Sequence, residues 1–227
     1  MRLTTRDVRL LRDMALSHVL SRDQIIALGY FGSVTRANTR LRLLGRFGLV
    51  RRIDTPFFSQ NLYCVGVKAS EIVGERIAKL VAGRAASPRF LQHALLTTNV
   101  RIELIRRGAS SWRFEQQLWV CFKFAGKEYQ VRPDGLADTA NGLIAVEVDL
   151  GHVAPAKFRE KLLAFDAFIA SGQCQRQWNA PSVSLLTLTT GKRRASQLLR
   201  LAPKGTAFAF ECHSLDVFGV PRVGGWS

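Results

Sequence analysis

The chain has few cysteines and no run of apolar residues long enough to span a bilayer. Its four cysteines are far apart and form no Cys-x-x-Cys pair, so the spacing of a zinc site or a disulfide scaffold is absent. We expect small buried apolar side chains at Cys64, Cys121, Cys174 and Cys212. A reducing, cytoplasmic location fits this usage, and the absence of a signal peptide or lipidation motif predicts no membrane anchor.

Acidic residues are the other scarce class. The 227 residues include 17 Asp and Glu against 33 Lys and Arg, which gives a formal net charge of +16. Such a surface attracts polyanions, and nucleic acid is the most common polyanion for a soluble protein. A scaffold that contacts only proteins does not explain this charge. Hydrophobic residues make up 47%, which excludes wholesale disorder.

Residues 1–66 have the strongest charge bias, with 11 Arg against 4 Asp and neither Lys nor Glu. Their pattern predicts three short helices followed by a hairpin. Thr5 is expected to cap the first helix, with Asp7 and Arg12 facing outward. A capping box, Ser21-Arg-Asp-Gln24, opens the second helix. Ser33 caps the third, which runs to about residue 47, and strands are expected at 49–53 and 61–65.

The run RANTRLRLLGRFGLVRR, residues 36–52, resembles the recognition helix and wing of the winged helix-turn-helix family. The resemblance implies that the third helix enters the major groove of double-stranded DNA while the wing touches phosphates. The implied DNA-binding residues are Arg36, Asn38, Arg40, Arg42 and Arg46 on the helix, with Arg51 and Arg52 on the wing. The alternatives are a merely solvated arginine face or a protein-interaction module.

Residues 67–87 are expected to form a linker helix, because Ala85, Ala86, Ser87 and Pro88 interrupt the helical pattern. This predicts a second domain over residues 88–213 and a C-terminal tail over 214–227. In the second domain we expect a helix at 89–107, strands at 112–120, 129–134 and 143–150, a helix at 156–170, a strand at 183–189, a helix at 192–201 and a strand at 207–212. The order indicates an α/β fold with a mixed sheet.

Residues 133–149 read as two strands joined at Asn141-Gly142. A two-residue loop would place Asp134 opposite Asp149, and a four-residue loop would place it opposite Glu147. Both registers put all three carboxylates on one face, because side chains alternate along a strand. Converging carboxylates repel unless a cation or a lysine neutralises them, and the pattern favours a divalent-metal site for Mg²⁺ or Mn²⁺. The alternative is a set of solvated acids at strand ends.

A helix, three strands, a helix and a strand, with Pro133-Asp134 and Glu147 at these places, resemble the PD-(D/E)XK nuclease superfamily. The resemblance implies that Asp134 and Glu147 hold magnesium while a lysine activates the attacking water. The lysine's usual position, two residues after the glutamate, is occupied by Asp149, which is therefore a candidate third ligand. Lys161 lies beside an apolar helical stripe and is the candidate replacement lysine. Lys157, one turn earlier, is a second candidate.

Two further acids have two interpretations each, and one histidine has a single expected role. Glu115 is either an additional acid near the metal or a solvated strand residue, and Glu103 is either a site acid or the partner of Arg107. His93 is expected to be a core histidine.

The whole chain also resembles the plasmid replication-relaxation (mobilisation-related) family. The resemblance rests on a winged helix, a Trp-x-x-Glu strand, the runs PDG and VEVD, and a downstream Lys-Leu. It implies bacterial DNA processing on plasmids or mobile elements, with double-stranded DNA as partner and a homodimer as one possible assembly. The alternative is a non-catalytic regulator whose nuclease-like domain grips DNA or dimerises.

Overall fold

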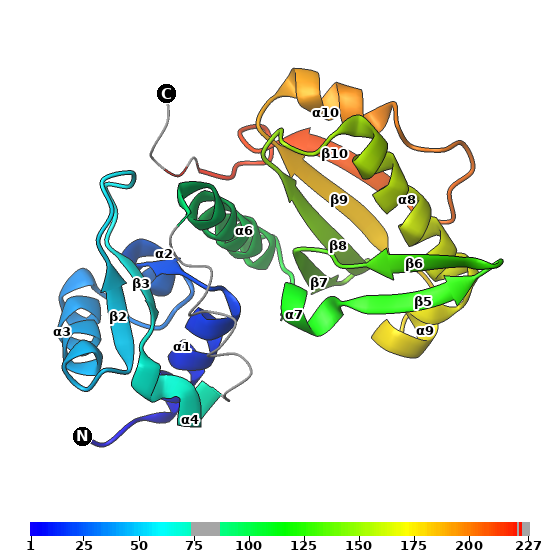
Figure 1. Cartoon of the computed structure of the whole chain (residues 1–227). Coiled ribbons are helices and arrows are strands. Elements are labelled where there is room, and N and C mark those ends of the chain that lie inside the picture. The colour runs from blue at the N-terminus through cyan, green and yellow to red at the C-terminus, as the bar shows by residue number, and fades with distance from the viewer. Residues whose placement is uncertain (74–86, 222, 224–227) are drawn as a thin grey trace. The chain divides into compact units, whose positions relative to one another are not determined.

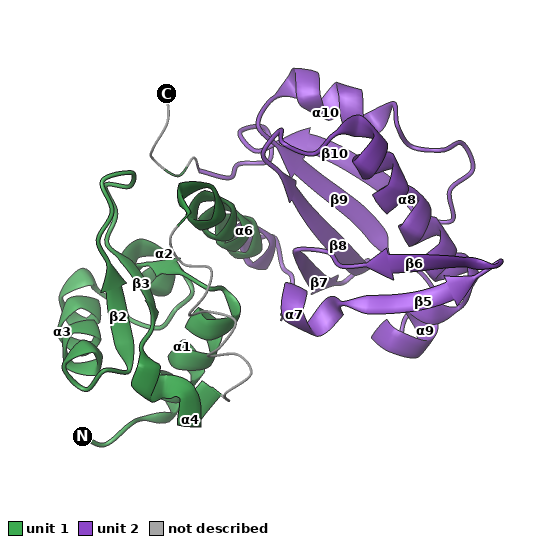
Figure 2. Cartoon of the chain, viewed as in Figure 1, with its two compact units in different colours: residues 1–102, 222–227 green, residues 103–221 purple. Residues whose placement is uncertain are grey.

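The computed structural model describes residues 1–73, 87–221 and 223. Two compact units divide the chain, the first formed by residues 1–102 with 222–227 and the second by residues 103–221 (Figure 2).

The first unit contains the three helices and the hairpin that the sequence predicts. Its elements are α1 (Thr5–Leu16), β1 (Leu20–Ser21), α2 (Arg22–Ala27), α3 (Val34–Arg46), β2 (Val50–Ile53), β3 (Leu62–Val65), the short 3-10 helix Val67–Ala69 and α4 (Ser70–Val73). The three strands form one antiparallel sheet in the order β1-β3-β2. Residues 67–73 belong to the predicted linker helix, and residues 74–86 of it lie outside the described part of the chain.

The start of α1 differs from the prediction in two respects. Thr4, not Thr5, is the N-cap, because its side chain accepts the Asp7 N–H while the Asp7 carboxylate accepts the Thr4 N–H. Asp7 does not face outward, since it is fully buried and forms an ion pair with Arg40 of α3. The predicted caps of α2 and α3 are confirmed, at Ser21 and Ser33.

We expect Asp7→Asn to lower the free energy of unfolding by about 2 kcal/mol, because it leaves the Arg40 guanidinium without its charged partner. Burial alone would raise the pKa of Asp7, but hydrogen bonds from Arg40 and Thr4 outweigh burial and lower it to about 2. Because its pKa is lowered, the ionised Asp7 carboxylate stabilises the fold at pH values above its ordinary pKa of 3.8. This stabilisation is lost as the pH falls toward 2. Urea unfolding at pH 7 and pH 3 should therefore show a smaller gap between wild type and variant at pH 3. An equal gap at both pH values would contradict this assignment.

The first unit extends further along the chain than the predicted domain of residues 1–66. Helix α6 (Pro88–Arg106) contributes its residues up to 102. Gln24 donates to the Leu95 carbonyl and to Asn99 Oδ1, each at 2.7 Å, and Arg101 pairs with Asp13 at 2.5 Å. The first compact unit therefore includes α6 up to residue 102, because polar contacts tie most of α6 to α1 and α2.

The second unit is built on a five-stranded mixed sheet in the order β10-β9-β8-β7-β4 (Figure 1). Strands β4, β7 and β8 are antiparallel neighbours, whereas β8, β9 and β10 run parallel. The mixed sheet confirms the expected α/β class. Its strands are β4 (Ser111–Phe114), β7 (Gly135–Thr139), β8 (Gly142–Asp149), β9 (Ser184–Thr189) and β10 (Phe210–Ser214).

The remaining elements depart from the prediction in their boundaries. The strand expected at 112–120 is interrupted, because α7 (Glu115–Leu118) separates β4 from β5 (Val120–Phe124). The strand expected at 129–134 ends at residue 131 and pairs only with β5, as β6 (Lys127–Val131). Helix α9 (Gln173–Trp178) was not predicted, and β10 continues to Ser214, into the predicted tail. Within that tail, residues 222 and 224–227 lie outside the described part.

Helices α8 (Pro155–Ala170) and α10 (Lys192–Leu199) cover one face of the five-stranded sheet (Figure 1). The apolar stripe predicted for α8 is buried in the core of this unit, with Phe158, Leu162 and Phe165 each at most 2% exposed. Packing of α8 therefore fixes which of its polar side chains can face the sheet.

Three of the four cysteines are buried, as predicted, but Cys121 is exposed. It lies on β5, whose neighbouring residue Phe122 packs toward α8, so alternation turns Cys121 to solvent. None of the helices in the described part of the chain has the length and apolar character needed to cross a bilayer.

Candidate active site

The hairpin of β7 and β8 adopts the register that the sequence predicts for the four-residue loop. Thr139 pairs with Gly142 and Gly135 with Val146, which is the last pair of the ladder. Asp134 lies just beyond that pair, and its N–H donates to the Val146 carbonyl at 2.9 Å. Of the two registers that the sequence left open, the structure therefore has the one that shifts Asp134 away from Asp149 and toward Glu147.

The carboxylate of Asp134 is oriented by the backbone of β8. Pro133 precedes it, and β7 begins only at Gly135. Asp134 Oδ2 accepts a hydrogen bond from the Val148 N–H at 2.7 Å. A charged acceptor bound to a backbone amide is held in one orientation, so Asp134 has a defined position beside Glu147.

Lys161 reaches the same place from α8. Its Nζ lies 2.5 Å from Glu147 Oε2, and the Glu147 side chain is only 5% exposed. Lys161 is 36% exposed, so its ammonium group lies between the buried acid and solvent. Lys157, the other lysine considered, is exposed and pairs with Glu160 at 2.9 Å. The structure therefore brings together Asp134, Glu147 and Lys161, which we call the acid–lysine cluster.

Electrostatics keep Lys161 protonated. Burial by itself lowers the pKa of Lys161, but the charges of Glu147, Asp134 and Glu115, together with the hydrogen bond to Glu147, outweigh burial. The net effect is a pKa above the ordinary value. Lys161 is thus a cation at neutral pH, suited to stabilising negative charge and not to acting as a base.

Glu115 lies at the rim of the cluster and not on a strand. It is the first residue of α7, and its Oε1 lies 2.8 Å from Arg132 Nε. Its charge nevertheless contributes to the raised pKa of Lys161. The sequence predicted no ion pair between Glu115 and Arg132, which lies in the loop between β6 and β7.

Asp149 forms an ion pair with Arg194 of α10. Arg194 Nε donates to Asp149 Oδ2 at 2.7 Å, and Thr189 Oγ1 donates to the same oxygen at 3.1 Å. Arg194 Nη2 also donates to the Val153 carbonyl at 2.5 Å, so the guanidinium is held on two sides. The Asp149 side chain is 3% exposed. Its carboxylate therefore serves a buried ion pair between the sheet and α10.

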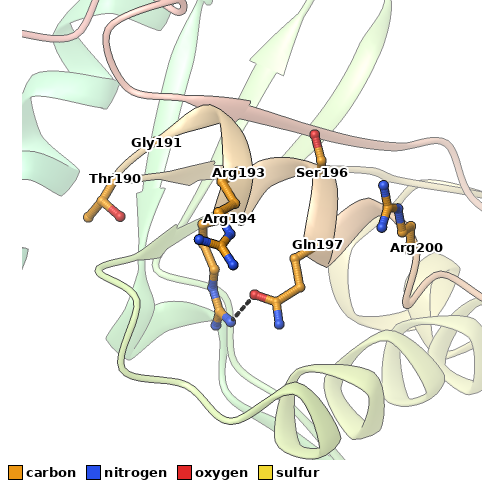
Figure 3. A pocket seen from close by; sticks show the side chains of 7 residues that line it. All are labelled: Thr190, Gly191, Arg193, Arg194, Ser196, Gln197 and Arg200. Carbon is orange, nitrogen blue, oxygen red and sulfur yellow. Dashed lines mark hydrogen bonds between the residues drawn. The ribbon is translucent and has the colours of Figure 1, made fainter.

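Arg194 lies at the wall of an open pocket of about 870 Å³ at the start of α10 (Figure 3). Its Nη1 donates to Gln197 Oε1 at 3.2 Å, and both side chains are drawn there. The pocket lining is neutral or cationic and consists of Thr190, Gly191, Arg193, Arg194, Ser196, Gln197 and Arg200. The sequence predicted a helix at 192–201 but no role for its arginines.

The acid–lysine cluster offers two carboxylates to a metal ion, not three. Among residues 1–73, 87–221 and 223, no group of three or more His, Cys, Asp or Glu side chains is placed to hold a metal. Mg²⁺ keeps several of its waters and is often bound through one or two carboxylates. The oxygen donors of Asp134 and Glu147 therefore fit such an ion as a two-carboxylate site.

Glu103 and His93, both on α6, were also considered from the sequence. Glu103 pairs with Arg106 and Arg107 at 2.7 Å each, as one of the two interpretations expected. Hydrogen bonds from these arginines lower the pKa of Glu103 to about 2 despite its burial. His93 is half-buried on α6.

The predicted DNA-binding arginines of the first unit fall into two groups. Arg40 is not available, because it is bound to Asp7 and donates to the Arg2 carbonyl. The exposed members are Arg36, Arg42, Arg46, Arg51 and Arg52. Asn38, Arg42 and Arg52 also line one pocket of about 370 Å³ between α3 and the β2–β3 hairpin, together with Asn61 and Tyr63.

Comparison with known proteins gives a family match and a distant structural likeness. The family model described as replication-relaxation matches residues 11–183, most of the chain. The crystal structure of protein VC1899 from Vibrio cholerae is 12% identical, with a TM-score of 0.35, over 93% of this chain and 47% of that chain. The present chain thus spans about half the length of that protein. Comparison with curated proteins finds no match.

Proposed function

The chain belongs to the replication-relaxation family, and from this premise we propose that it processes the DNA of plasmids or other mobile elements. In this proposal the first unit binds duplex DNA as a winged helix, and the second unit hydrolyses a phosphodiester bond as a PD-(D/E)XK-like nuclease. The observation that carries the catalytic part is the contact of Lys161 Nζ with Glu147 Oε2, beside Asp134.

The cluster's residues have complementary roles in this reaction. Asp134 and Glu147 would hold Mg²⁺ or Mn²⁺, which supplies a Lewis acid and lowers the pKa of a bound water. Lys161, held protonated by its acidic neighbours, offsets the negative charge that develops on the phosphate. The order of elements around the cluster supports the superfamily assignment: α6, the antiparallel strands β4, β7 and β8, then α8 and β9.

The order of elements in the first unit and its exposed positive charge support the proposal that it binds DNA. Three helices precede a hairpin, and α3 presents Arg36, Arg42 and Arg46 to solvent. Arg42 and Arg52 share a pocket with Asn38, so α3 and the hairpin offer one continuous basic surface. Arg40 has no part in this surface, because Asp7 holds it.

One observation favours a second candidate function. Asp149 is bound to Arg194, so the cluster has two carboxylates instead of three. A non-catalytic DNA-binding accessory protein, whose second unit grips DNA or forms a homodimer, is consistent with that deficit.

Cleavage of supercoiled and linear DNA in Mg²⁺ and in Mn²⁺ distinguishes these functions. We expect nicked or linear product with the wild-type protein and none with Asp134→Ala, because that substitution removes one of the two carboxylates. EDTA should abolish the product. Cleavage that survives Asp134→Ala, or its absence with both metals, would overturn the enzymatic proposal in favour of the accessory protein.

DNA binding by the first unit is tested separately. We expect Arg42→Ala with Arg52→Ala to weaken duplex binding and to reduce the slope of log affinity against log salt by about 1 for each phosphate that the variant no longer neutralises. Arg12→Ala is the matched control, because Arg12 is an exposed arginine on α1 outside the pocket. Fluorescence anisotropy across a salt series measures both quantities. Equal effects of the pair and of the control would refute docking through α3 and the hairpin.

A further inference from the structure

Trp119 is a large aromatic side chain on the surface of the second unit. It is 58% exposed, whereas Trp178 of the same unit is 5% exposed and packs against Phe168. A single exposed apolar residue needs no explanation by itself, so its surroundings decide whether it has a role.

The neighbours of Trp119 fix its exposure. It follows α7 with an extended backbone, at φ −70° and ψ 117°. Leu118, just before it, and Phe122, three residues after it, are buried in the core, whereas the indole is on the surface. The outward position is therefore set by the chain that supports it.

Two contacts extend from Trp119 toward the acid–lysine cluster. The guanidinium of Arg132 lies 5.3 Å from the centroid of the Trp119 ring and pairs with Glu115 at 2.8 Å. The charge of Glu115 in turn acts on Lys161. Arg132 is also two residues before Asp134 in the sequence. A planar aromatic surface with an attached cation thus lies next to the proposed site of hydrolysis.

We propose that Trp119 stacks on an unpaired base of the DNA that enters the acid–lysine cluster, so that the substrate there is single-stranded or locally unpaired. This inference rests on the proposed function. An aromatic ring beside cations is the arrangement that binds single strands, because the ring stacks on a base while the cations follow the phosphates. In a continuous duplex each base is already stacked and paired, and it must leave the helix to be reached.

The test measures binding without cleavage, with the full chain in EDTA. A fluorescent single-stranded oligonucleotide is compared with the same strand carrying abasic sites, which keeps the phosphates and removes the bases. We expect Trp119→Ala to weaken binding of the intact strand by about tenfold and to leave binding of the abasic strand unchanged. Trp119→Phe, which retains a ring, should recover most of the affinity. Duplex binding should be the same in all three proteins.

Each outcome has one meaning. A loss confined to the intact strand supports stacking, whereas equal losses on intact, abasic and duplex DNA would overturn it. Unchanged binding of the intact strand by Trp119→Ala would also overturn it. If the alanine variant unfolds at a lower temperature, the wild type and Trp119→Phe provide the test. The affinity of each for the intact strand is then compared with its affinity for the abasic strand. A protein that binds in this way but cleaves nothing would refute the proposed hydrolysis and leave the stacking inference standing.

Discussion

Lys161→Met is expected to slow metal-dependent DNA cleavage by about 10²- to 10³-fold, the loss typical of removing one group that stabilises developing negative charge. Methionine keeps the length of the side chain and its packing beside the buried stripe of α8, but it removes the ammonium group that contacts Glu147. Single-turnover cleavage at saturating protein measures the loss without a contribution from DNA affinity.

Lys157→Met is the matched control for this prediction. Lys157 lies one turn earlier on α8, is exposed and pairs only with Glu160, so its replacement should leave the rate unchanged. Lys161→Arg should recover part of the activity, because it retains the positive charge while changing the geometry. Equal losses in Lys157→Met and Lys161→Met would show that the basic surface of α8, and not the acid–lysine cluster, determines the rate.

The position of Lys161 near the acids of the hairpin could be predicted, because it follows from two local sequence patterns. Period-two alternation put Asp134 and Glu147 on one face, and the apolar stripe of α8 put Lys161 beside the sheet. The register could not be predicted, since the turn at Asn141-Gly142 allowed two loop lengths. The structure centres the turn on Ala140-Asn141, with Gly142 at φ 107°, and pairs Thr139 with Gly142.

The ion pairs that the sequence did not predict join residues that are distant in sequence. Arg40 was predicted to bind DNA, but it pairs with Asp7, 33 residues away. Asp149 was predicted to bind metal, but it pairs with Arg194, 45 residues away. Nothing in the local pattern around either acid identifies the arginine that tertiary packing brings to it. From the sequence alone, a charged residue that binds a ligand therefore looks the same as one that forms a buried ion pair.

Asp149→Ala is expected to destabilise the second unit by about 3–4 kcal/mol, because it leaves Arg194 largely buried without its charged partner. Urea unfolding followed by circular dichroism measures this loss. Asp149→Leu combined with Arg194→Met should be clearly more stable than either single substitution, since apolar side chains then replace both buried charges. Single losses that simply add in the double variant would contradict a direct pairing of the two residues.

The same series separates structure from catalysis at Asp149. If its carboxylate serves only the ion pair, a folded Asp149→Leu/Arg194→Met protein should retain metal-dependent cleavage, because Asp134, Glu147 and Lys161 remain in place. If Asp149 instead binds the metal, the double variant should fold but lose cleavage, and Mn²⁺ should bind it more weakly. The Asp149–Arg194 contact predicts that cleavage is retained. In that case two carboxylates are enough to bind the metal, and Asp149, at the position of the missing lysine, supports the fold.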